Sequence, residues 1–381
     1  ESLYGADHVR PLGDYALLDL PAEDINFKRL GGTIKTARIL ANLPYTDWPQ
    51  ISKYLKEKVP EHLRHADEGK FTLGLSVYGL NVKLNNLNKL GLELKKIIKA
   101  SGRPARVVPN KALDLNSAQV LHNGLTRRGA WELLMVKDSQ QTILAQTLFV
   151  QDIEAYAARD QKRPMRDARV GMLPPKLAQI IINLAAGAIE RNPENAERRH
   201  RIRVLDPFCG TGVVLQEAML MGYSVVGTDL EPRMIEYTQK NIQWLVERNP
   251  SLETQVVLET GDATSYQWAG FSLVASEVFL GRPLGKLPDQ AELKKVVSDA
   301  NTITRKFLEN IAKQMKQGQQ MCLAVPAWQV GRDRFIHLPL IDHLTEMGYN
   351  NLDLTHARRQ DLIYFRADQV VARQLLILTK A

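Results

Sequence analysis

The sequence predicts an α/β protein in which a C-terminal, mostly parallel, doubly wound sheet with an antiparallel hairpin at its end follows smaller α+β units. Strand-like runs and helical stretches alternate through the C-terminal half, which is the order that forms a parallel sheet. A glycine-rich turn joins the first strand of that series to a helix. The last two apolar runs flank a short turn at 367–368, so we expect them to pair as the hairpin.

The composition is typical of a globular protein, and the length predicts more than one domain. Of the 381 residues, 44% are hydrophobic and 24% are charged. The sequence holds no apolar run of membrane-spanning length, it starts without a signal-peptide pattern, and its two cysteines are too few for a disulfide framework, so we expect a cytoplasmic protein. The net charge of +8 favours a polyanionic partner such as a nucleic acid, and a basic enzyme without one is the alternative.

The N-terminal half alternates short strand-like runs with helical stretches, which predicts two α+β units. Residues 1–47 hold strand-like runs at 15–20 and 33–40 around a short helix-compatible stretch. Residues 48–150 follow the order helix, strand, helix, strand, helix, strand, strand. The expected elements of this second unit are helix 48–63, strand 71–78, a helix around 87–98, strand 105–108, helix 116–123 and strands 131–136 and 142–150.

A basic linker is expected at 151–175, and the larger domain at 176–381. The linker ends at Pro174 and Pro175, which fix where the next helix begins. Arginines of the linker and of a later loop are expected to hold nucleic-acid phosphates, namely Arg163, Arg166, Arg169 and Arg282. The larger domain is expected to contain helices 176–189, 213–221, 232–246, 293–316 and 338–347 and strands 201–205, 223–227, 255–259, 272–275, 321–325, 351–354, 362–365 and 371–378.

The glycine-rich turn lies in Asp206-Pro-Phe-Cys-Gly-Thr-Gly212. Gly210 and Gly212 allow a sharp turn and a close approach of ligand to backbone, at the carboxyl end of a strand where open α/β sheets bind ligands. A dinucleotide site would need a third glycine where this chain has Leu215, and Asp206 would repel a pyrophosphate. The ammonium of a methionine moiety suits Asp206 better, so S-adenosylmethionine is the expected cofactor.

Two further acids end the next two strands. Asp229 follows the turn by about 20 residues, where a carboxylate can accept both hydroxyls of a ribose. Asp262 can accept from an adenine amino group, and its alternative is a turn residue with a local hydrogen bond. Acids at three successive strand ends favour a cofactor site, and no metal site is expected.

These motifs resemble a known family. Asp-Pro-Phe-Cys-Gly-Thr-Gly, Gly227-Thr-Asp229 and Gly261-Asp-Ala263 resemble nucleic-acid methyltransferases that use S-adenosylmethionine, and the run Gly171-Met-Leu-Pro-Pro-Lys-Leu-Ala178 resembles the THUMP-domain tRNA guanine-N2 methyltransferases. The resemblance implies a ferredoxin-like unit at 1–47, a THUMP RNA-binding domain at 48–150 and a Rossmann-like methyltransferase domain at 176–381. It implies tRNA as the substrate and leaves a small accessory subunit open. The implied cofactor residues are Asp206, Phe208, Cys209, Gly210, Gly212, Asp229, Leu230, Asp262 and Ala263.

The methyl-acceptor motif departs from that family at Ser276-Glu-Val-Phe-Leu-Gly281. Family members end this strand in Asp or Asn, two prolines and an aromatic residue, whereas here Glu277 replaces the acid, both prolines are missing and Leu280 follows Phe279. We expect Glu277 to hydrogen-bond the target amine and Phe279 to stack on a flipped-out base. Two alternatives stay open: another amine in DNA or protein is methylated, or Glu277 pairs with Arg282 in a domain that binds cofactor and RNA without transferring methyl groups.

Overall fold

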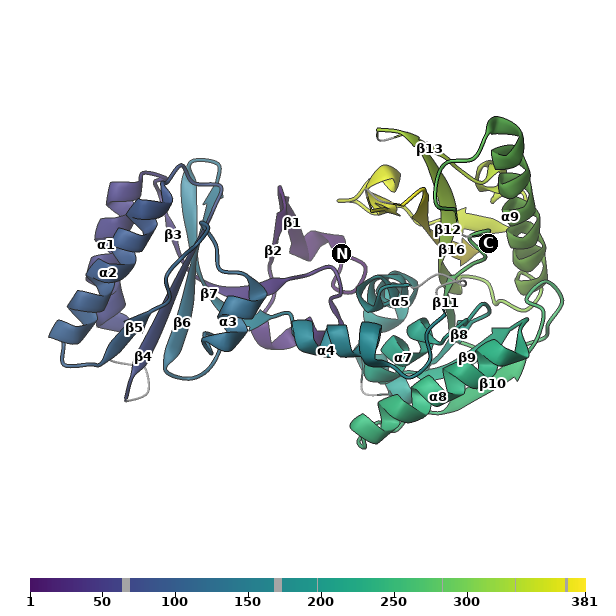
Figure 1. Cartoon of the computed structure of the whole chain (residues 1–381), viewed down its shortest axis with the longest axis horizontal. Coiled ribbons are helices and arrows are strands. Elements are labelled where there is room, and N and C mark those ends of the chain that lie inside the picture. Colours follow the sequence, from purple (N-terminus) through teal and green to yellow (C-terminus); the bar gives the residue numbers. More distant parts are fainter. Residues whose placement is uncertain (64–68, 168–172, 197, 283, 333, 367–368) are drawn as a thin grey trace. The chain divides into compact units, whose positions relative to one another are not determined.

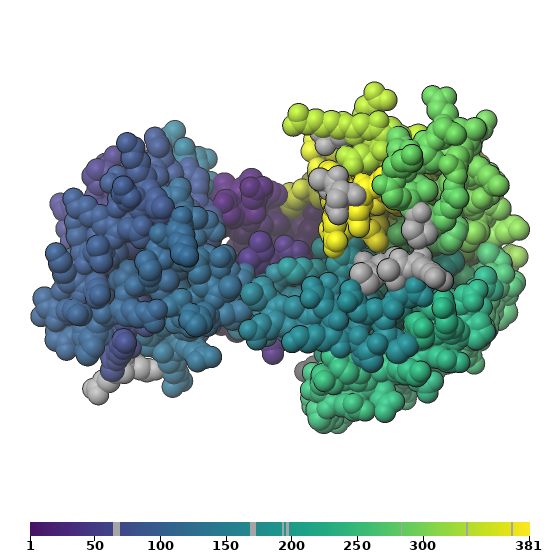
Figure 2. All heavy atoms as spheres, viewed as in Figure 1, coloured from purple at the N-terminus to yellow at the C-terminus, as the bar shows by residue number. Residues whose placement is uncertain are grey.

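The computed structural model describes residues 1–63, 69–167, 173–196, 198–282, 284–332, 334–366 and 369–381. The chain divides into two compact units (Figure 1). The smaller unit comprises 20–28 and 33–156, and the larger unit comprises 1–19, 29–32 and 157–381. Figure 2 shows the same view with all heavy atoms drawn, and buried apolar side chains pack between the helices and the sheet within each unit.

In the smaller unit, the described strands form a five-stranded sheet in the order β3-β7-β6-β4-β5. Helices α1 and α2 cover one face, where Leu55, Leu87 and Leu94 are fully buried, and α3 lies on the other face (Figure 1). Strand β4 runs parallel to β5 and β6, and the remaining pairs are antiparallel. The elements are β3 (Lys35–Leu43), α1 (Trp48–His62), β4 (Phe71–Tyr78), α2 (Leu84–Ala100), β5 (Ala105–Val107), α3 (Ser117–His122), β6 (Ala130–Asp138) and β7 (Gln141–Val150).

The two units divide the chain differently from the boundaries that the sequence predicts. Strand β3, expected in a separate unit at 1–47, pairs along β7 and completes the sheet of the smaller unit. Arg29 belongs to the larger unit, where its guanidinium donates to Tyr223 at 2.8 Å and to Glu190 at 2.7 Å. These pairings join residues about 100 or more positions apart, which sequence spacing does not reveal. The ferredoxin-like and THUMP assignments and the linker stay predictions.

In the larger unit, nine of the described strands form one sheet in the order β10-β9-β8-β11-β12-β16-β14, with β13 beside β12 and β15 beside β16. The first five strands of this order are parallel and the others join antiparallel. The structure therefore confirms a mostly parallel sheet with an antiparallel end. The predicted hairpin is the pair β15 and β16, and its turn at 367–368 lies outside the described residues.

Helices cover both faces of this sheet. Helices α5, α7 and α8 contribute to one apolar cluster, and α9 to the other. The helices are α5 (Pro175–Glu190), α6 (Pro193–Ala196), α7 (Val213–Leu220), α8 (Pro232–Arg248) and α9 (Gln290–Ile311). Helix α4 (Ile153–Ala157) spans the division of the chain, with residues 153–156 in the smaller unit and Ala157 in the larger. The strands are β8 (Arg203–Asp206), β9 (Ser224–Asp229), β10 (Val256–Thr260), β11 (Leu273–Glu277), β12 (Gln320–Gly331), β13 (Arg334–Ile336), β14 (Tyr349–Asn351), β15 (Ile363–Tyr364) and β16 (Val371–Lys380); β1 (Val9–Leu12) and β2 (Tyr15–Leu18) form a separate hairpin.

Several short segments are tighter helical turns. The helix predicted at 338–347 is wrong, because only a 3-10 segment forms there, at Pro339–His343. Leu340 and Leu344 still bury their side chains against the α9 face, so the apolar spacing reflects burial without α-helical hydrogen bonding. The other short segments are 3-10 turns at Ala6–His8, Ala22–Asp24, Phe27–Arg29, Arg199–Arg201 and Arg359–Leu362 and a π-helical turn at Ala158–Lys162.

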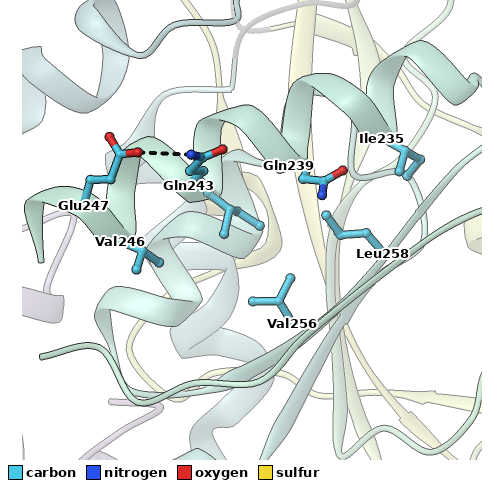
Figure 3. A pocket seen from close by; sticks show the side chains of 8 residues that line it. Ile235, Gln239, Gln243, Val246, Glu247, Val256 and Leu258 are labelled. Carbon is cyan, nitrogen blue, oxygen red and sulfur yellow. Dashed lines mark hydrogen bonds between the residues drawn. The ribbon is translucent and has the colours of Figure 1, made fainter. Parts of the chain in front are cut away.

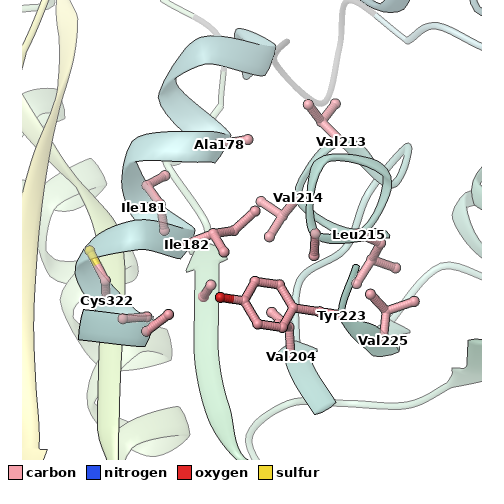
Figure 4. Close-up of a cluster of buried hydrophobic side chains, with 14 of the residues drawn as sticks. Ala178, Ile181, Ile182, Val204, Val213, Val214, Leu215, Tyr223, Val225 and Cys322 are labelled. Carbon is pink, nitrogen blue, oxygen red and sulfur yellow. The ribbon is translucent and has the colours of Figure 1, made fainter. Parts of the chain in front are cut away.

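A single glycine on β9 lets α7 pack close to the sheet. Figure 4 shows Val214 and Leu215 of α7 beside Ile182 of α5 and Val225 of β9 in one buried cluster. A Cβ at Gly227 would stand 2.4 Å from Leu215 Cδ1, a distance that core side chains cannot accommodate without moving. Dinucleotide-binding folds use a glycine on the helix for this close packing. Here the glycine lies on the strand instead, which explains why the helix can carry Leu215.

The substitution Gly227→Ala should therefore destabilise the larger unit by about 1–3 kcal/mol, because the added methyl group overpacks the core. Leu215→Ala alone should also destabilise the unit, because it leaves a cavity, but the double variant should lose less than the sum of the two single losses, since the atom that the added methyl group meets is gone. Urea unfolding of the three variants measures both effects. Gly285→Ala is the matched control, because nothing lies within 4 Å of its Cβ position. Equal stability of Gly227→Ala and the wild type would contradict this packing account.

Candidate functional site

A cavity of about 590 Å³ opens at the carboxyl ends of β8, β9 and β11. Its lining includes Glu277 and Phe279 and most of the predicted cofactor residues. Those residues are Asp206, Phe208, Cys209, Gly210, Asp229, Leu230, Asp262 and Ala263. Gly212, which caps the N-terminus of α7, is not part of the lining, although its neighbours Thr211 and Val213 are. The geometry therefore brings the acids of three strand ends and the acceptor motif to one hollow, as the topology of a parallel sheet requires.

Asp206 is a buried carboxylate without a cationic partner among the described residues. Its Oδ1 accepts from Ser276 Oγ at 2.6 Å and from the Phe208 N–H at 3.3 Å. Burial raises the pKa of Asp206 from its usual 3.8 to about 7, these two hydrogen bonds oppose the rise, and the carboxylates of Asp229 and Glu277 add to it. A ligand cation in the cavity would supply the missing countercharge.

Asp229 is oriented by two backbone N–H groups. Its Oδ2 accepts from Gly210 N–H at 2.9 Å and its Oδ1 from Glu231 N–H at 3.0 Å. Burial nevertheless raises the pKa of the Asp229 carboxyl, and the hydrogen bonds from Glu231 and Gly210 reduce the rise. The hydrogen bond from the Gly210 N–H to Asp229 also fixes the glycine turn to the end of β9.

Asp262 makes the local hydrogen bonds expected of a turn residue, and it also lines the cavity. Its Oδ1 accepts from both the N–H and the hydroxyl of Thr264, at 2.9 and 2.8 Å. The carboxyl is exposed, and among the described residues no hydrogen bond reaches Oδ2. A turn contact and a ligand contact are therefore compatible at this residue.

The glycine turn is shaped by side chains of α8. Gly210 and Gly212 have φ values of +52° and +80°, which favour glycine. Thr238 Oγ1 donates to the Gly210 carbonyl at 2.8 Å, and Asn241 Nδ2 donates to the Thr211 carbonyl at 2.9 Å. Cys209 is buried, and burial raises the pKa of its thiol well above the usual value. Its role in the turn is therefore packing.

Glu277 pairs with a residue that the sequence did not single out. Its Oε1 accepts from Arg373 Nε at 2.6 Å, whereas Arg282 pairs with Glu292. The alternative in which Arg282 holds Glu277 is therefore wrong, because Arg282 lies on the exposed loop that follows. Burial raises the pKa of the Glu277 carboxyl, and Arg373 opposes the rise. Phe279 is 40% exposed on the cavity lining, where its ring is free to meet a ligand.

Helix α9 adds cavity residues that sequence reasoning missed. Thr302, Ile303 and Lys306 line the hollow from this helix, and Arg233 lines it from α8. The spacing of the three α9 residues follows one helical face, which is the only sequence signal for them. That signal does not reveal which strand end the helix covers.

The predicted phosphate-binding arginines differ in exposure. Arg166 and Arg282 are exposed, and Arg169 lies outside the described residues. Arg163 is only 3% exposed, and its Nε and Nη2 are buried without a hydrogen-bond partner. A phosphate of a large ligand does not reach a guanidinium in that position, so the structure does not support Arg163 as an RNA contact.

A second hollow, of about 620 Å³, lies between α8 and β10. Figure 3 shows Ile235 and Val246 of α8 near Val256 and Leu258 of β10. Glu247 is the one acid among the described residues that line it, so it lacks the acidic character of the first hollow. Within the described part of the chain, no helix has the length and apolarity to cross a membrane, and no group of three or more His, Cys, Asp or Glu is arranged to hold a metal ion.

The raised pKa of Asp206 predicts how stability depends on pH. Between about pH 4 and 7 the unfolded chain loses this proton and the ligand-free native state keeps it, so the free energy of unfolding falls as pH rises. Asp206→Asn should remove that fall. The free energy of unfolding of this variant should equal that of the wild type near pH 4 and exceed it by at least ~1 kcal/mol at pH 8. Thermal unfolding at both pH values measures the difference. Exposed Asp353→Asn is the control, and a destabilised Asp206→Asn at pH 8 would contradict the burial argument.

Comparisons with known proteins agree with this site. Residues 199–358 match the family described as "Methyltransferase domain". The chain is 39% identical over 115 residues to the tRNA (guanine(10)-N2)-dimethyltransferase of Methanothermobacter thermautotrophicus, covering 30% of each chain. It is 31% identical over 127 residues to the protein of that name from Pyrococcus abyssi, covering 32% of this chain and 33% of the relative.

The matched stretches thus span about a third of the length of these curated relatives. A structural match is TrmN from Thermus thermophilus, with a TM-score of 0.48 and 17% identity over 95% of this chain and 88% of that chain. The glycine turn, the three strand-end acids and the acceptor motif all lie within the segment that the family model matches. Residues 199–358 are therefore similar to methyltransferase domains, and part of the chain is similar in sequence to tRNA (guanine(10)-N2)-dimethyltransferases.

Proposed function

We propose that this protein is an S-adenosylmethionine-dependent RNA methyltransferase that methylates N2 of a guanine in tRNA. The observation that carries the proposal is the convergence of Asp206, Asp229 and Asp262 on the cavity that Glu277 and Phe279 also line. The methyltransferase-domain match supports the reaction, and the names of the curated relatives support tRNA guanine N2 as the acceptor. We further propose a cytoplasmic location, where tRNA is found.

The cavity fits this cofactor better than a nucleotide with phosphates. Among the residues that the structure describes, no cation pairs with buried Asp206, and the ammonium of a methionine moiety would supply that countercharge. Asp229 would accept the ribose hydroxyls, and Asp262 Oδ2 would accept from the adenine amino group. A pyrophosphate would instead meet two carboxylates. When bound, the cofactor supplies an electrophilic methyl group on a positively charged sulfur.

The residues of the acceptor motif would position the target base. The exocyclic amine of guanine is a weak nucleophile because its lone pair is delocalised into the ring, so most of the rate enhancement must come from orientation. Glu277 would accept a hydrogen bond from that amine on Oε2, which has no hydrogen-bond partner among the described residues. The exposed ring of Phe279 would stack on the base once it leaves its helix.

The charge of the chain suits a nucleic-acid partner. The net charge is +8, and the exposed side chains of Arg166 and Lys306 lie in the larger unit, Lys306 on the cavity lining itself. A small accessory subunit, if the enzyme uses one, would find unpaired backbone groups at β10, an edge strand of the described sheet with exposed Val256 and Val257.

Cofactor affinity should depend on pH because a cationic ligand needs Asp206 ionised. Calorimetric titration of the full chain with S-adenosylmethionine should show the affinity rising up to ~tenfold per pH unit from about pH 5 to 7 and levelling off above the pKa of about 7. Asp206→Asn should weaken binding ~100-fold at pH 8, since it removes the charge-assisted contact, and should flatten the profile. Affinity independent of both pH and this substitution would refute the assignment of Asp206.

Methyl transfer tests the reaction directly. With labelled cofactor and unmodified tRNA, the label should appear in N2-methylated guanosine after digestion. Glu277→Gln should lower kcat ~100-fold with cofactor affinity kept within about threefold, because it removes the acceptor charge. Phe279→Ala should raise the KM for tRNA ~10-fold, because one stacking contact is lost.

Exposed Glu236→Gln on α8 is the control for that experiment and should behave as wild type. Tight cofactor binding with no label in tRNA would contradict the proposed reaction and would favour an RNA-binding protein that binds the cofactor without transferring its methyl group. Label in DNA or protein amines, and none in tRNA, would favour the other acceptor class.

A further inference from the structure

The carboxylate of Glu277 is tied to a strand that is not its neighbour in the sheet. Glu277 ends β11, and Arg373 lies on β16, with β12 between them. Glu277 is beside Ala324 of β12, and Arg373 is opposite Pro326 of the same strand. The arginine side chain therefore spans the middle strand where that strand carries small side chains. Its Nε reaches Glu277 Oε1 at 2.6 Å.

This ion pair is nearly withdrawn from solvent. The Arg373 and Glu277 side chains are 7% and 14% exposed, beside the apolar cluster that contains Ala275, Ala324 and Leu375. A buried ion pair seldom adds stability over well-packed apolar side chains, because removing two charges from water costs about as much as their attraction returns. Stability alone therefore gives no reason for the pair, and the place of Glu277 on the cavity wall indicates a role in the site.

We propose that Arg373 is the positioning residue of the acceptor site: it holds Glu277 by one carboxylate oxygen, so that Oε2 remains available to the target amine. This inference rests on the proposed methyltransferase function. Arg373 touches neither cofactor nor base in this account and acts only through Glu277. No motif marks it, since 96 residues separate the two partners.

The backbone beyond Glu277 provides less restraint than two prolines would. Val278 is buried and donates its N–H to the Ala324 carbonyl at 3.1 Å, which extends the strand pairing by one residue. The chain then leaves the sheet at Phe279 and turns at Gly281, whose φ is +86°. Proline would fix φ along this stretch. Here the planar guanidinium of Arg373 on β16 holds the carboxylate of Glu277 by a hydrogen bond instead.

The charge of Arg373 also sets the protonation state of Glu277. The carboxyl is buried, Arg373 is the cation that contacts it, and the Asp206 carboxylate lies close enough to interact with it. The other titratable or charged groups of the cavity lining are Cys209, Asp229, Glu231, Arg233, Asp262 and Lys306. With Arg373 removed, burial and the neighbouring carboxylates would both favour the protonated acid. A protonated Glu277 would present a donor where the amine needs an acceptor.

The test compares Arg373→Met with Arg373→Lys in the full chain, using two independent measurements. The first is the titration of Glu277, isolated in isotope-edited infrared spectra by subtracting Glu277→Gln. The second is kcat as a function of pH with labelled cofactor and unmodified tRNA, together with calorimetric cofactor affinity. Arg359→Met, which removes an exposed ion pair with Asp353, is the control.

Arg373→Met should move the titration of Glu277 upward by at least ~1 pH unit. At pH 7 its kcat should fall ~100-fold and recover partly at higher pH, with cofactor affinity within about threefold of the wild type. Arg373→Lys keeps the charge and loses the planar donor, so its titration should stay near that of the wild type while kcat falls ~10-fold.

An unchanged titration of Glu277 in Arg373→Met would overturn the inference, and so would a wild-type kcat in both variants. If Arg373→Met does not fold, Arg373→Lys decides: a kcat equal to wild type overturns the proposal, and the ~10-fold loss with intact cofactor binding supports it. If the wild-type protein transfers no methyl group to tRNA, the proposed function fails. The infrared titration then still decides whether Arg373 holds Glu277 ionised.

Discussion

The buried carboxylate of Asp206 is the constraint around which the larger unit is arranged. It ends β8 in the middle of the sheet, and its described hydrogen bonds come from one hydroxyl and one backbone N–H. With a pKa of about 7 in the ligand-free protein, it stands ready to ionise beside a cation. In the proposed function, this carboxylate would favour a cationic ligand over one with phosphates, at a cost to the stability of the ligand-free fold.

Backbone contacts place the other predicted ligand-binding residues, the glycine turn and Asp229, at the same cavity. Gly227 on β9 lets α7 pack against the sheet, and Thr238 and Asn241 on α8 hold the glycine turn by its carbonyls. The Gly210 N–H in turn orients Asp229. Strand, turn and helix therefore share these contacts on the cofactor side of the cavity. The acceptor side depends on side chains instead, through Glu277 and Arg373.

The parts of this architecture that the sequence predicted are those with local signals. Strand ends, the glycine turn and the three acids are adjacent in sequence to the elements that carry them, so their convergence on one cavity could be predicted. Arg373 and Lys306 could not, because their roles depend on which strand lies beside which. The same limitation affected β3, whose partner β7 lies about 100 residues away, and Arg163, whose burial no local pattern in the sequence indicates. The apolar spacing at 338–347 predicted burial correctly and helix type wrongly.

The most direct test of the central claim is a crystal structure of the protein with bound S-adenosylmethionine. The account predicts that the methionine ammonium lies on Asp206, the ribose on Asp229 and the adenine amine on Asp262. It also predicts that the transferable methyl group faces the Glu277 carboxylate and the ring of Phe279. A cofactor bound elsewhere, or a methyl group directed away from Glu277 toward a closed wall, would contradict it.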